Sequence, residues 1–298
     1  MDSSAIDELH TIADFVRWAA SRFNEAHLYF GHGTDNAVDE AVALVLQTLH
    51  LGQELPPLLW QGRLTYREKT QLLNQLQLRL EKRIPVPYLT QQAWFAQLPF
   101  YVDQRVLIPR SPIAELIEAR YAPWLEIEQV NRVLDLCCGS GCIGIATAIK
   151  SFPEAEVDLV DISPDALAVA QKNIDEYQLN DKVHIVQSDL FTELAGIHYD
   201  LIVTNPPYVD AQALEEMPEE YHHEPVLGLA AGEDGLSFAH QILAQAKRHL
   251  TPHGILVVEV GASAPALIAA YPDLPFLWLE FARGGEGVFL LTYDQLPD

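Results

Sequence analysis

The sequence predicts an α/β protein in which a seven-stranded, mostly parallel sheet follows a helical bundle and a β-hairpin linker. From residue 131 onward, short apolar runs alternate with helical segments, which is typical of a parallel sheet covered by helices on both faces. Residues 1–88 instead place apolar side chains at three- and four-residue steps, which indicates helices alone. The 298 residues are enough for about two domains.

The N-terminal segment, residues 1–88, is predicted to be a small helical bundle. Apolar periodicity predicts helices over 4–24 and 36–50. A third helix should begin after Thr65, because Thr65 and Glu68 have the spacing of a capping box. Two closely spaced prolines then mark the end of this helix and of the bundle.

Residues 89–110 are predicted to form a β-hairpin linker. Aromatic and β-branched residues predict one strand within 94–102 and a second at 105–108. Ser111, with a proline directly after it, is typical of a helix N-terminus. The third domain, 111–298, is therefore expected to begin there.

The sheet is expected to come from this third domain. A tight final pair of strands, joined by a glycine-rich turn, predicts an antiparallel strand at one edge of a parallel sheet. The predicted strands cover residues 133–136, 157–161, 183–186, 201–204, 255–260, 276–282 and 287–292.

The chain is strongly acidic, and the charge is uneven. The net charge is −24, and residues 131–298 carry 7 basic and 26 acidic side chains. Such a chain binds nucleic acid or an anionic membrane poorly, so neither DNA nor a membrane is an expected partner. The charge suits a basic partner, although solubility alone would explain it equally well.

The cysteines and histidines do not predict a disulfide or a metal site. All three cysteines lie within residues 137–142, and no distant cysteine could pair with them. This usage is typical of a reducing cytoplasm, which is the predicted location. His222-His223-Glu224 also lacks the ligand spacing of a zinc site, so no metal is expected.

A glycine-rich loop follows the first predicted strand. Gly139-Ser140-Gly141 and Gly144 form a G-x-G-x-x-G pattern that opens a helix, and Asp161 ends the next strand. Dinucleotide sites use these features, because glycine lets the backbone approach the pyrophosphate and the carboxylate binds ribose hydroxyls. S-adenosylmethionine also carries a ribose, and its own carboxylate suits backbone N–H groups. The loop alone fits a nicotinamide oxidoreductase as well as an S-adenosylmethionine enzyme.

Asn205-Pro206-Pro207-Tyr208 follows the fourth strand, at the sheet edge where ligands bind in open α/β folds. The prolines fix the backbone and remove two N–H donors, which leaves carbonyl and amide oxygens as acceptors. Two such acceptors could hold both N–H bonds of a planar NH₂ group and raise the electron density of its nitrogen. A methyl group on a sulfonium could then be transferred in line, with positioning and electrostatics lowering the barrier.

Together these motifs resemble the class I S-adenosylmethionine-dependent methyltransferases that act on planar nitrogens, which implies a Rossmann-like fold. The helical N-terminus and hairpin narrow the resemblance to the protein-(glutamine-N5) methyltransferases. Residues 108–115 depart from the release-factor branch and, with 29–36 and 221–225, resemble the branch that methylates ribosomal protein L-three. The motifs that carry the resemblance are Asp135-Leu136-Cys137-Cys138-Gly139-Ser140-Gly141, Asp161, Asp189 and Asn205-Pro206-Pro207-Tyr208.

The resemblance implies a role for each motif. Loop 137–141 would hold the methionine part of S-adenosylmethionine, Asp161 the ribose and Asp189 the adenine end. Taken alone, Asp189 would fit a loop or helix cap equally well. The implied cofactor-binding residues are Asp135, Cys137, Gly139, Ser140, Gly141, Asp161, Ile162, Asp189, Leu190 and Asn205. The implied substrate-binding residues are Asn205, Pro206, Pro207 and Tyr208, of which Asn205, Pro206 and Tyr208 would be catalytic.

One residue departs from the family pattern. Cys137 stands where these enzymes usually have the first glycine of the loop. A cysteine is small enough for the cofactor to fit, but a left-handed backbone conformation is less favourable for it than for glycine.

The resemblance further implies a ribosomal protein substrate, with residues 1–88 as the domain that recognises it. The acidity of the chain predicts that this protein is methylated before the ribosome is fully assembled, because an acidic chain avoids exposed ribosomal RNA. The acidic segment 209–234 fits a lid that attracts a basic protein and a solvated loop equally well. Whether Arg110 or Glu224 touches substrate stays open. Four other functions remain: a release-factor methyltransferase, an adenine-N6 methyltransferase, which would lack a basic patch here, a nicotinamide oxidoreductase, and a non-catalytic assembly factor that binds the cofactor for structure.

Overall fold

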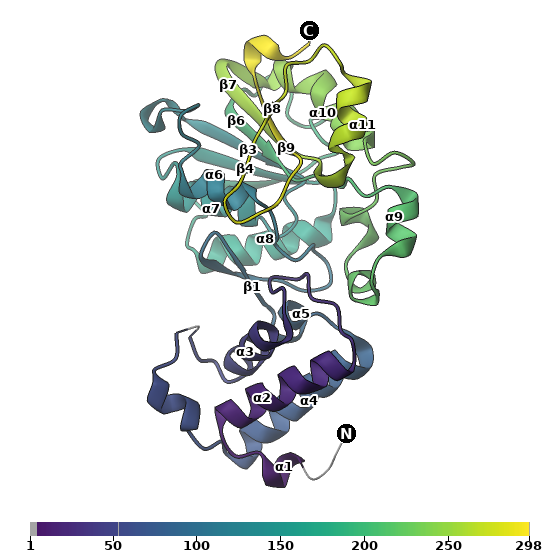
Figure 1. The fold of residues 1–298 in the computed structure, drawn as a ribbon. Helices are drawn as coiled ribbons and strands as arrows, with labels where there is room; N and C mark the ends of the chain where they lie inside the picture. Colours follow the sequence, from purple (N-terminus) through teal and green to yellow (C-terminus); the bar gives the residue numbers. More distant parts are fainter. Residues whose placement is uncertain (1–4, 53, 298) are drawn as a thin grey trace. The chain divides into compact units, whose positions relative to one another are not determined.

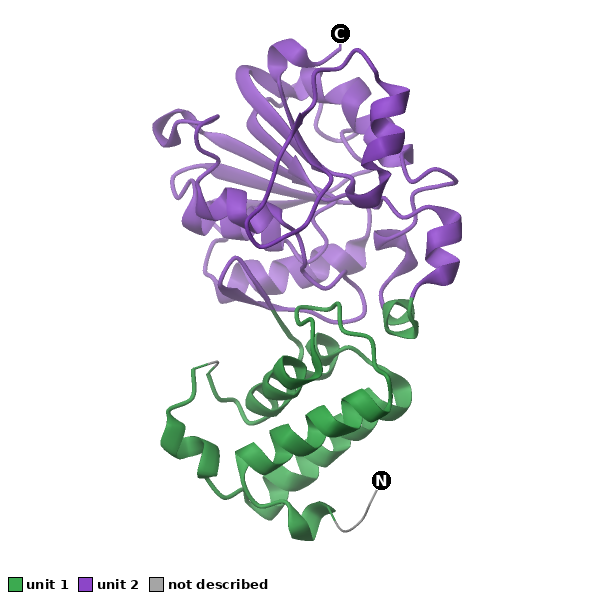
Figure 2. Ribbon diagram, in the orientation of Figure 1, with its two compact units in different colours: residues 1–93, 218–223 green, residues 94–217, 224–298 purple. Residues whose placement is uncertain are grey.

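The computed structural model describes residues 5–52 and 54–297. The chain divides into two compact units (Figure 2). The helical unit comprises residues 1–93 and 218–223, and the sheet unit comprises residues 94–217 and 224–298. A short segment from the C-terminal half of the sequence thus belongs to the helical unit.

The helical unit is a bundle whose core is formed by the apolar faces of its helices. Phe15, Phe23, Leu44, Leu72 and Leu76 are all fully buried in one cluster. The helices are α1 (Ala5–Glu8), α2 (Ile12–Glu25), α3 (Ala37–Thr48), α4 (Tyr66–Lys82) and α5 (Val86–Thr90), with a 3₁₀ turn at Pro57–Gln61 (Figure 1).

The prediction of one helix over 4–24 is wrong, because the chain forms α1 and α2 with a break between them. Thr11 starts α2 through a capping box: its hydroxyl accepts from the Asp14 N–H at 3.1 Å, and its own N–H donates to Asp14 Oδ2 at 2.8 Å. The apolar periodicity continues through this break and hides it. The capping box of Thr65 and Glu68 at the start of α4 is confirmed.

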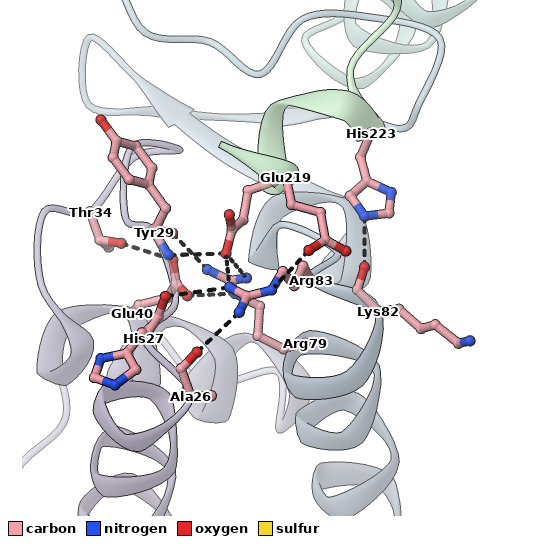
Figure 3. Close-up of polar contacts among 11 residues, drawn as sticks. Ala26, His27, Tyr29, Thr34, Glu40, Arg79, Lys82, Arg83, Glu219 and His223 are labelled. Carbon is pink, nitrogen blue, oxygen red and sulfur yellow. Dashed lines mark hydrogen bonds and ion pairs between the residues drawn. The ribbon is translucent and has the colours of Figure 1, made fainter. Parts of the chain in front are cut away.

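A buried ion-pair cluster, defined as Arg79, Arg83, Glu40 and Glu220, joins segment 218–223 to the helices of this unit (Figure 3). Arg79 is fully buried on α4 and donates to Glu40 Oε1 at 2.7 Å, to Glu220 Oε1 at 3.3 Å and to the Tyr29 carbonyl at 2.9 Å. Arg83 adds a contact of 3.1 Å to Glu220. Both carboxylates are almost fully buried, so they depend on these cations for their charge.

The cluster shifts the pKa values of its two carboxyl groups in opposite directions. Burial raises the pKa of Glu40 above its ordinary value, although Arg79 opposes this. Burial also acts to raise the pKa of Glu220, but the Tyr29 N–H, Arg79 and Arg83 outweigh it, so that pKa is lowered. Glu220 is therefore the more firmly ionised member of the cluster.

Strands β1 (Gln92–Phe95) and β2 (Leu98–Tyr101) form a two-stranded hairpin. It is shorter than predicted, because the second strand ends at residue 101 and not at 108. The two residues of its turn, Ala96 and Gln97, have φ values of +46° and +63°. The turn therefore lacks the glycine or asparagine that usually marks such a conformation. The strand predicted at 105–108 does not form. Instead Asp103 accepts from the Arg105 N–H at 3.1 Å and from its guanidinium at 2.8 Å, which turns the chain.

The seven-stranded sheet has the order β5-β4-β3-β6-β7-β9-β8. The first five strands in this order, β5, β4, β3, β6 and β7, pair in parallel. Strand β9 lies between β7 and β8 and is antiparallel to both, so the predicted antiparallel edge is confirmed. The strand predicted over 276–282 shrinks to two residues. The strands are β3 (Arg132–Leu136), β4 (Glu156–Asp161), β5 (Val183–Gln187), β6 (Tyr199–Thr204), β7 (Leu250–Glu259), β8 (Leu277–Trp278) and β9 (Val288–Thr292).

Helices cover both faces of this sheet (Figure 1). Successive residues of β3 show why: Val133 belongs to the apolar cluster of one face and Leu134 to that of the other. Helices α6 (Ile113–Glu118), α7 (Cys142–Lys150) and α8 (Pro164–Glu176) pack on the first face, and α10 (Ser237–Gln245) and α11 (Ala264–Ala270) on the second. Across residues 5–52 and 54–297, no helix is long and apolar enough to cross a membrane.

The strand order places a ligand site at the carboxyl ends of β3 and β6. The chain runs from β3 outward to β4 and β5, then returns to β6 on the other side of β3. Ligands of open α/β sheets bind at such a switch point. The motifs predicted to be functional all follow strands that end at this edge.

Candidate active site

A cavity of about 400 Å³ opens at this edge of the sheet unit. Its size falls within the ~300–1,000 Å³ of small-molecule sites. Nine predicted residues lie on its wall: Cys137, Gly139, Ser140, Asp161, Ile162, Asp189, Leu190, Asn205 and Pro207. Four others, Asp135, Gly141, Pro206 and Tyr208, do not contribute to the wall.

The glycine loop presents its backbone to the cavity. Cys137, Gly139 and Gly141 have φ values of +60°, +54° and +76°. Cys137 thus adopts the left-handed conformation that the sequence identified as unfavourable for a cysteine. A Cβ added at Gly139 would meet no atom within 4 Å, so its backbone borders open space and can closely approach a ligand.

Asp161 is tied to the loop and still has the capacity to bind a ligand. Its Oδ2 accepts from the Gly139 N–H and its Oδ1 from the Ser163 N–H, both at 2.9 Å. Burial raises the pKa of Asp161, although these N–H groups oppose the shift. Each carboxylate oxygen keeps a further lone pair, which suits the two hydroxyls of a ribose.

Asp135, on β3, is hydrogen-bonded to the first turn of α7, the helix that follows the loop. It is 1% exposed, and its Oδ2 accepts from the Gly144 N–H at 2.7 Å. A Cβ at Gly144 would come within 2.9 Å of the Asp135 Cβ, so this close packing requires glycine. Burial raises the pKa of Asp135 to about 8, which keeps the side chain largely protonated near neutral pH.

The environment of the three thiols beside the cavity favours their protonated form. Burial raises the pKa of Cys142 to about 12, and it also raises the pKa values of Cys137 and Cys138, with Asp161 and Asp135 adding to the effect there. A protonated thiol is a poor nucleophile and a poor metal ligand. In the described part of the chain, no group of three or more acidic, histidine or cysteine side chains is arranged to hold a metal ion.

The Asn-Pro-Pro-Tyr motif is held rigidly at the end of β6. The hydroxyl of Thr204, just before it, donates to the Leu136 carbonyl at 2.5 Å and so fixes β6 against β3. Asn205 is partly exposed on the cavity wall, while the two prolines after it are buried. The Tyr208 hydroxyl donates to Glu259 Oε1 at 3.0 Å.

The acidic segment 209–234 is not simply a solvated loop. Its base is closed by a bridge between Val209 and Ala230. Glu224 is buried and forms a two-pronged ion pair with Arg110, with both N–O distances at 2.6 Å. Glu220 belongs to the buried cluster of the helical unit, so two of the segment's carboxylates anchor it.

These anchors were not predicted from the sequence. Nothing local in the sequence distinguishes a carboxylate that will be buried from one that stays exposed. The partners of Glu224 and Glu220 lie more than a hundred residues away in the chain. The only sequence signal for the two anchors would be their arginine partners, Arg110 before α6 and Arg79 in the last turn of α4.

The fold and the site together define a class I, S-adenosylmethionine-dependent methyltransferase. A Rossmann-like sheet carries a left-handed glycine loop, a carboxylate after the second parallel strand and an Asn-Pro-Pro-Tyr motif on one cavity. The family description "Methyltransferase small domain" matches residues 121–220.

Comparison with curated proteins narrows the class. A "ribosomal protein uL3 glutamine methyltransferase" of Francisella tularensis subsp. tularensis is 50% identical over 292 residues, covering 98% of this chain and 93% of that protein. A relative of the same description from Xanthomonas campestris pv. campestris is 51% identical over 296 residues, covering 99% and 96%. The chain belongs to the uL3 glutamine methyltransferase family, and its cofactor is S-adenosylmethionine.

A solved structure shares the fold at much lower identity. The hMettl16 catalytic domain, solved in complex with a MAT2A 3'UTR hairpin, is 17% identical and aligns with a TM-score of 0.52. The match covers 76% of this chain and 81% of that one. It confirms the predicted methyltransferase fold.

Proposed function

We propose that this enzyme methylates the side-chain amide nitrogen (N5) of a glutamine in ribosomal protein uL3. The observation that carries the proposal is that Asn205 and Pro207 lie on the same cavity wall as Asp161 and the glycine loop. A planar amide bound by Asn205 would therefore face the cofactor directly. The names of the two relatives support uL3 as the protein that carries this glutamine.

The cavity residues fit S-adenosylmethionine. The open backbone at Gly139 suits the methionine carboxylate, the lone pairs of Asp161 suit the ribose hydroxyls, and exposed Asp189 suits the adenine amino group. When bound, the cofactor supplies a methyl group on an electron-poor sulfonium. Cys137, Ser140, Ile162 and Leu190 complete this wall, while Asp135 and Gly141 support it from below.

The chemistry assigned to the Asn-Pro-Pro-Tyr motif is orientation of a weak nucleophile. The oxygen of Asn205 and the carbonyl of Pro206 would accept the two amide protons, and Pro207, whose ring nitrogen is bonded to that carbonyl, would fix its orientation. Tyr208 does not line the cavity itself, but it directly follows the wall residue Pro207, and from there it would pack on the amide plane. Fixing the nitrogen in line with the methyl group supplies much of the rate enhancement, because the reaction then needs little reorganisation.

The charge of the chain bears on when uL3 is methylated. A net charge of −24 disfavours contact with ribosomal RNA, so free uL3 is the better substrate than uL3 in an assembled subunit. We expect methylation in the cytoplasm, before assembly is complete, with the helical unit contributing to recognition of uL3.

Transfer of a labelled methyl group tests this proposal. Purified enzyme is incubated with labelled S-adenosylmethionine and with free uL3, intact large subunits or a release factor. The proposal predicts one labelled glutamine in free uL3 and much less label in subunits. Label on the release factor alone would overturn the substrate assignment, and equal labelling of free and assembled uL3 would overturn the timing.

A further inference from the structure

A buried carboxylate connects three segments of the sheet unit that are distant in sequence. Glu259 ends β7 and is 4% exposed. Its Oε1 accepts from the Tyr208 hydroxyl at 3.0 Å, and its Oε2 accepts from the Ser111 hydroxyl at 2.5 Å. Glu259 is not on the cavity wall, whereas Ser111 is.

The residues after Glu259 fix the rest of Tyr208. Gly261 has a φ of +48°, and a Cβ there would lie 2.7 Å from Cε2 of the Tyr208 ring, so the backbone packs directly on the ring. The Ser263 hydroxyl donates to the Tyr208 carbonyl at 2.9 Å. Tyr208 is thus held at its hydroxyl, its ring and its backbone by one stretch of chain.

Packing alone does not account for a carboxylate at this position. Burying an ionisable group costs free energy unless hydrogen bonds or opposite charges compensate. The two hydroxyls satisfy one lone pair on each oxygen of Glu259, and Arg110 contributes a favourable charge. An apolar side chain would fill the space without this cost, but it would leave the Tyr208 hydroxyl without its acceptor.

We propose that Glu259, with Ser111, is a positioning residue for methyl transfer: it holds the Tyr208 ring in the plane that packs on the substrate amide. This inference rests on the proposed function, in which Tyr208 contacts the glutamine. Glu259 acts through Tyr208 and touches neither substrate nor cofactor. Its loss therefore slows the chemical step, while the affinity for the cofactor stays the same.

The ionisation of Glu259 gives this role a pH dependence. Burial raises the pKa of Glu259 to about 7, although Ser111, Tyr208 and Arg110 act to lower it. The neighbouring strand β9 faces it with Val288, which does not titrate. Only the ionised form accepts from both hydroxyls without a rearrangement, so turnover rises as Glu259 loses its proton.

The test is a double-mutant cycle of Glu259→Gln and Tyr208→Phe, with kcat and KM measured for methylation of uL3. In an otherwise wild-type enzyme, Glu259→Gln should lower kcat by about 10- to 100-fold, as expected for a misplaced reacting group. In the Tyr208→Phe background, the same change should have almost no further effect. Equal losses in both backgrounds, or no loss in either, would overturn the proposal.

Three measurements separate positioning from general damage. S-adenosylhomocysteine affinity by calorimetry should be unchanged in Glu259→Gln, and the rise of kcat near neutral pH should disappear. Tyr199→Phe is the matched control, because its hydroxyl also donates to a buried carboxylate, Asp158, at 2.7 Å, but at the opposite end of β6. Its kcat should stay at the wild-type value. A tenfold weaker cofactor affinity in Glu259→Gln would contradict the proposal.

A second variant keeps the proposal testable if Glu259→Gln does not fold. Ser111→Ala removes the other hydroxyl from the same carboxylate and should lower kcat only when Tyr208 is present. Additive effects of Ser111→Ala and Tyr208→Phe would overturn the proposal. The two proposals fail in different ways. If the proposed function is wrong, the wild-type enzyme places no label on uL3, and this is seen before any variant is compared.

Discussion

Replacing Arg79 by Met should strongly destabilise the helical unit. Arg79 is fully buried and donates to Glu40, Glu220 and the Tyr29 carbonyl. Without it, Glu220 keeps Arg83 and the Tyr29 N–H, whereas Glu40 keeps, among the described residues, the hydroxyl of Thr34 at 3.3 Å. Breaking a buried ion pair by removing one partner costs about 3–5 kcal/mol, which is the expected loss in free energy of unfolding.

The pH dependence of this loss has a definite sign. Burial already raises the native pKa of Glu40 despite Arg79, and removal of Arg79 raises it further. A carboxyl group with a raised native pKa contributes stability at low pH, and this contribution is lost as the pH rises through that pKa. The deficit of Arg79→Met should therefore be larger at about pH 8 than at about pH 5.

Urea unfolding, with hydrogen exchange to locate the change, measures the effect. Exchange should accelerate in peptides of the helical unit, including 218–223. The double variant Arg79→Met/Glu40→Leu should recover much of the loss, because it removes the unpaired charge as well. Arg22→Met is the control: its pair with Glu25 is 44% and 65% exposed, so it should cost less than about 1 kcal/mol. A loss below about 1 kcal/mol for Arg79→Met, or no recovery in the double variant, would show that Arg79 does not compensate the buried charge of Glu40.

The remaining predictions concern the sheet unit. Asn205→Ala should lower kcat by about 10²–10³-fold, because one preorganised polar group is lost. The affinity for S-adenosylhomocysteine, measured by calorimetry, should stay near normal. Turnover at the wild-type rate would indicate that Asn205 is not catalytic. Asp161→Ala should weaken that affinity about 10- to 100-fold, because hydrogen bonds to a charged group are lost, and unchanged affinity would exclude Asp161 from the cofactor site. Arg105 lowers the pKa of Asp103 to about 2, but the pair is partly exposed, so Asp103→Asn should cost only about 1 kcal/mol near neutral pH in chemical unfolding. This cost should vanish as the pH falls from about 4 to about 2, and a pH-independent cost would contradict the ion-pair explanation.

Local patterns predicted the parts of the fold that depend on neighbours in sequence. The capping box at Thr65, the parallel strands and the glycine loop are all encoded within a few residues. Because carboxyl ends of parallel strands meet at one edge, the same patterns predicted that Asp161 and Asn205 would share a wall.

Long-range pairs could not be predicted in this way. Glu259 and Ser111 are 148 residues apart, and Arg79 and Glu220 are 141 apart, and no local pattern marks either pair. The acidic segment illustrates the same limit, because burial of Glu220 and Glu224 depends on arginines elsewhere in the chain. Likewise, the turn at Ala96-Gln97 needs positive φ values that its residue types do not indicate.

Mass spectrometry of uL3 from cells with and without the gene is the most direct way to establish that this enzyme methylates a glutamine of uL3. We expect uL3 from cells lacking the gene to be lighter by one methyl group, and we expect fragmentation to place the missing group on a glutamine side chain. An unchanged uL3, or the loss of a methyl group from a release factor instead, would contradict it.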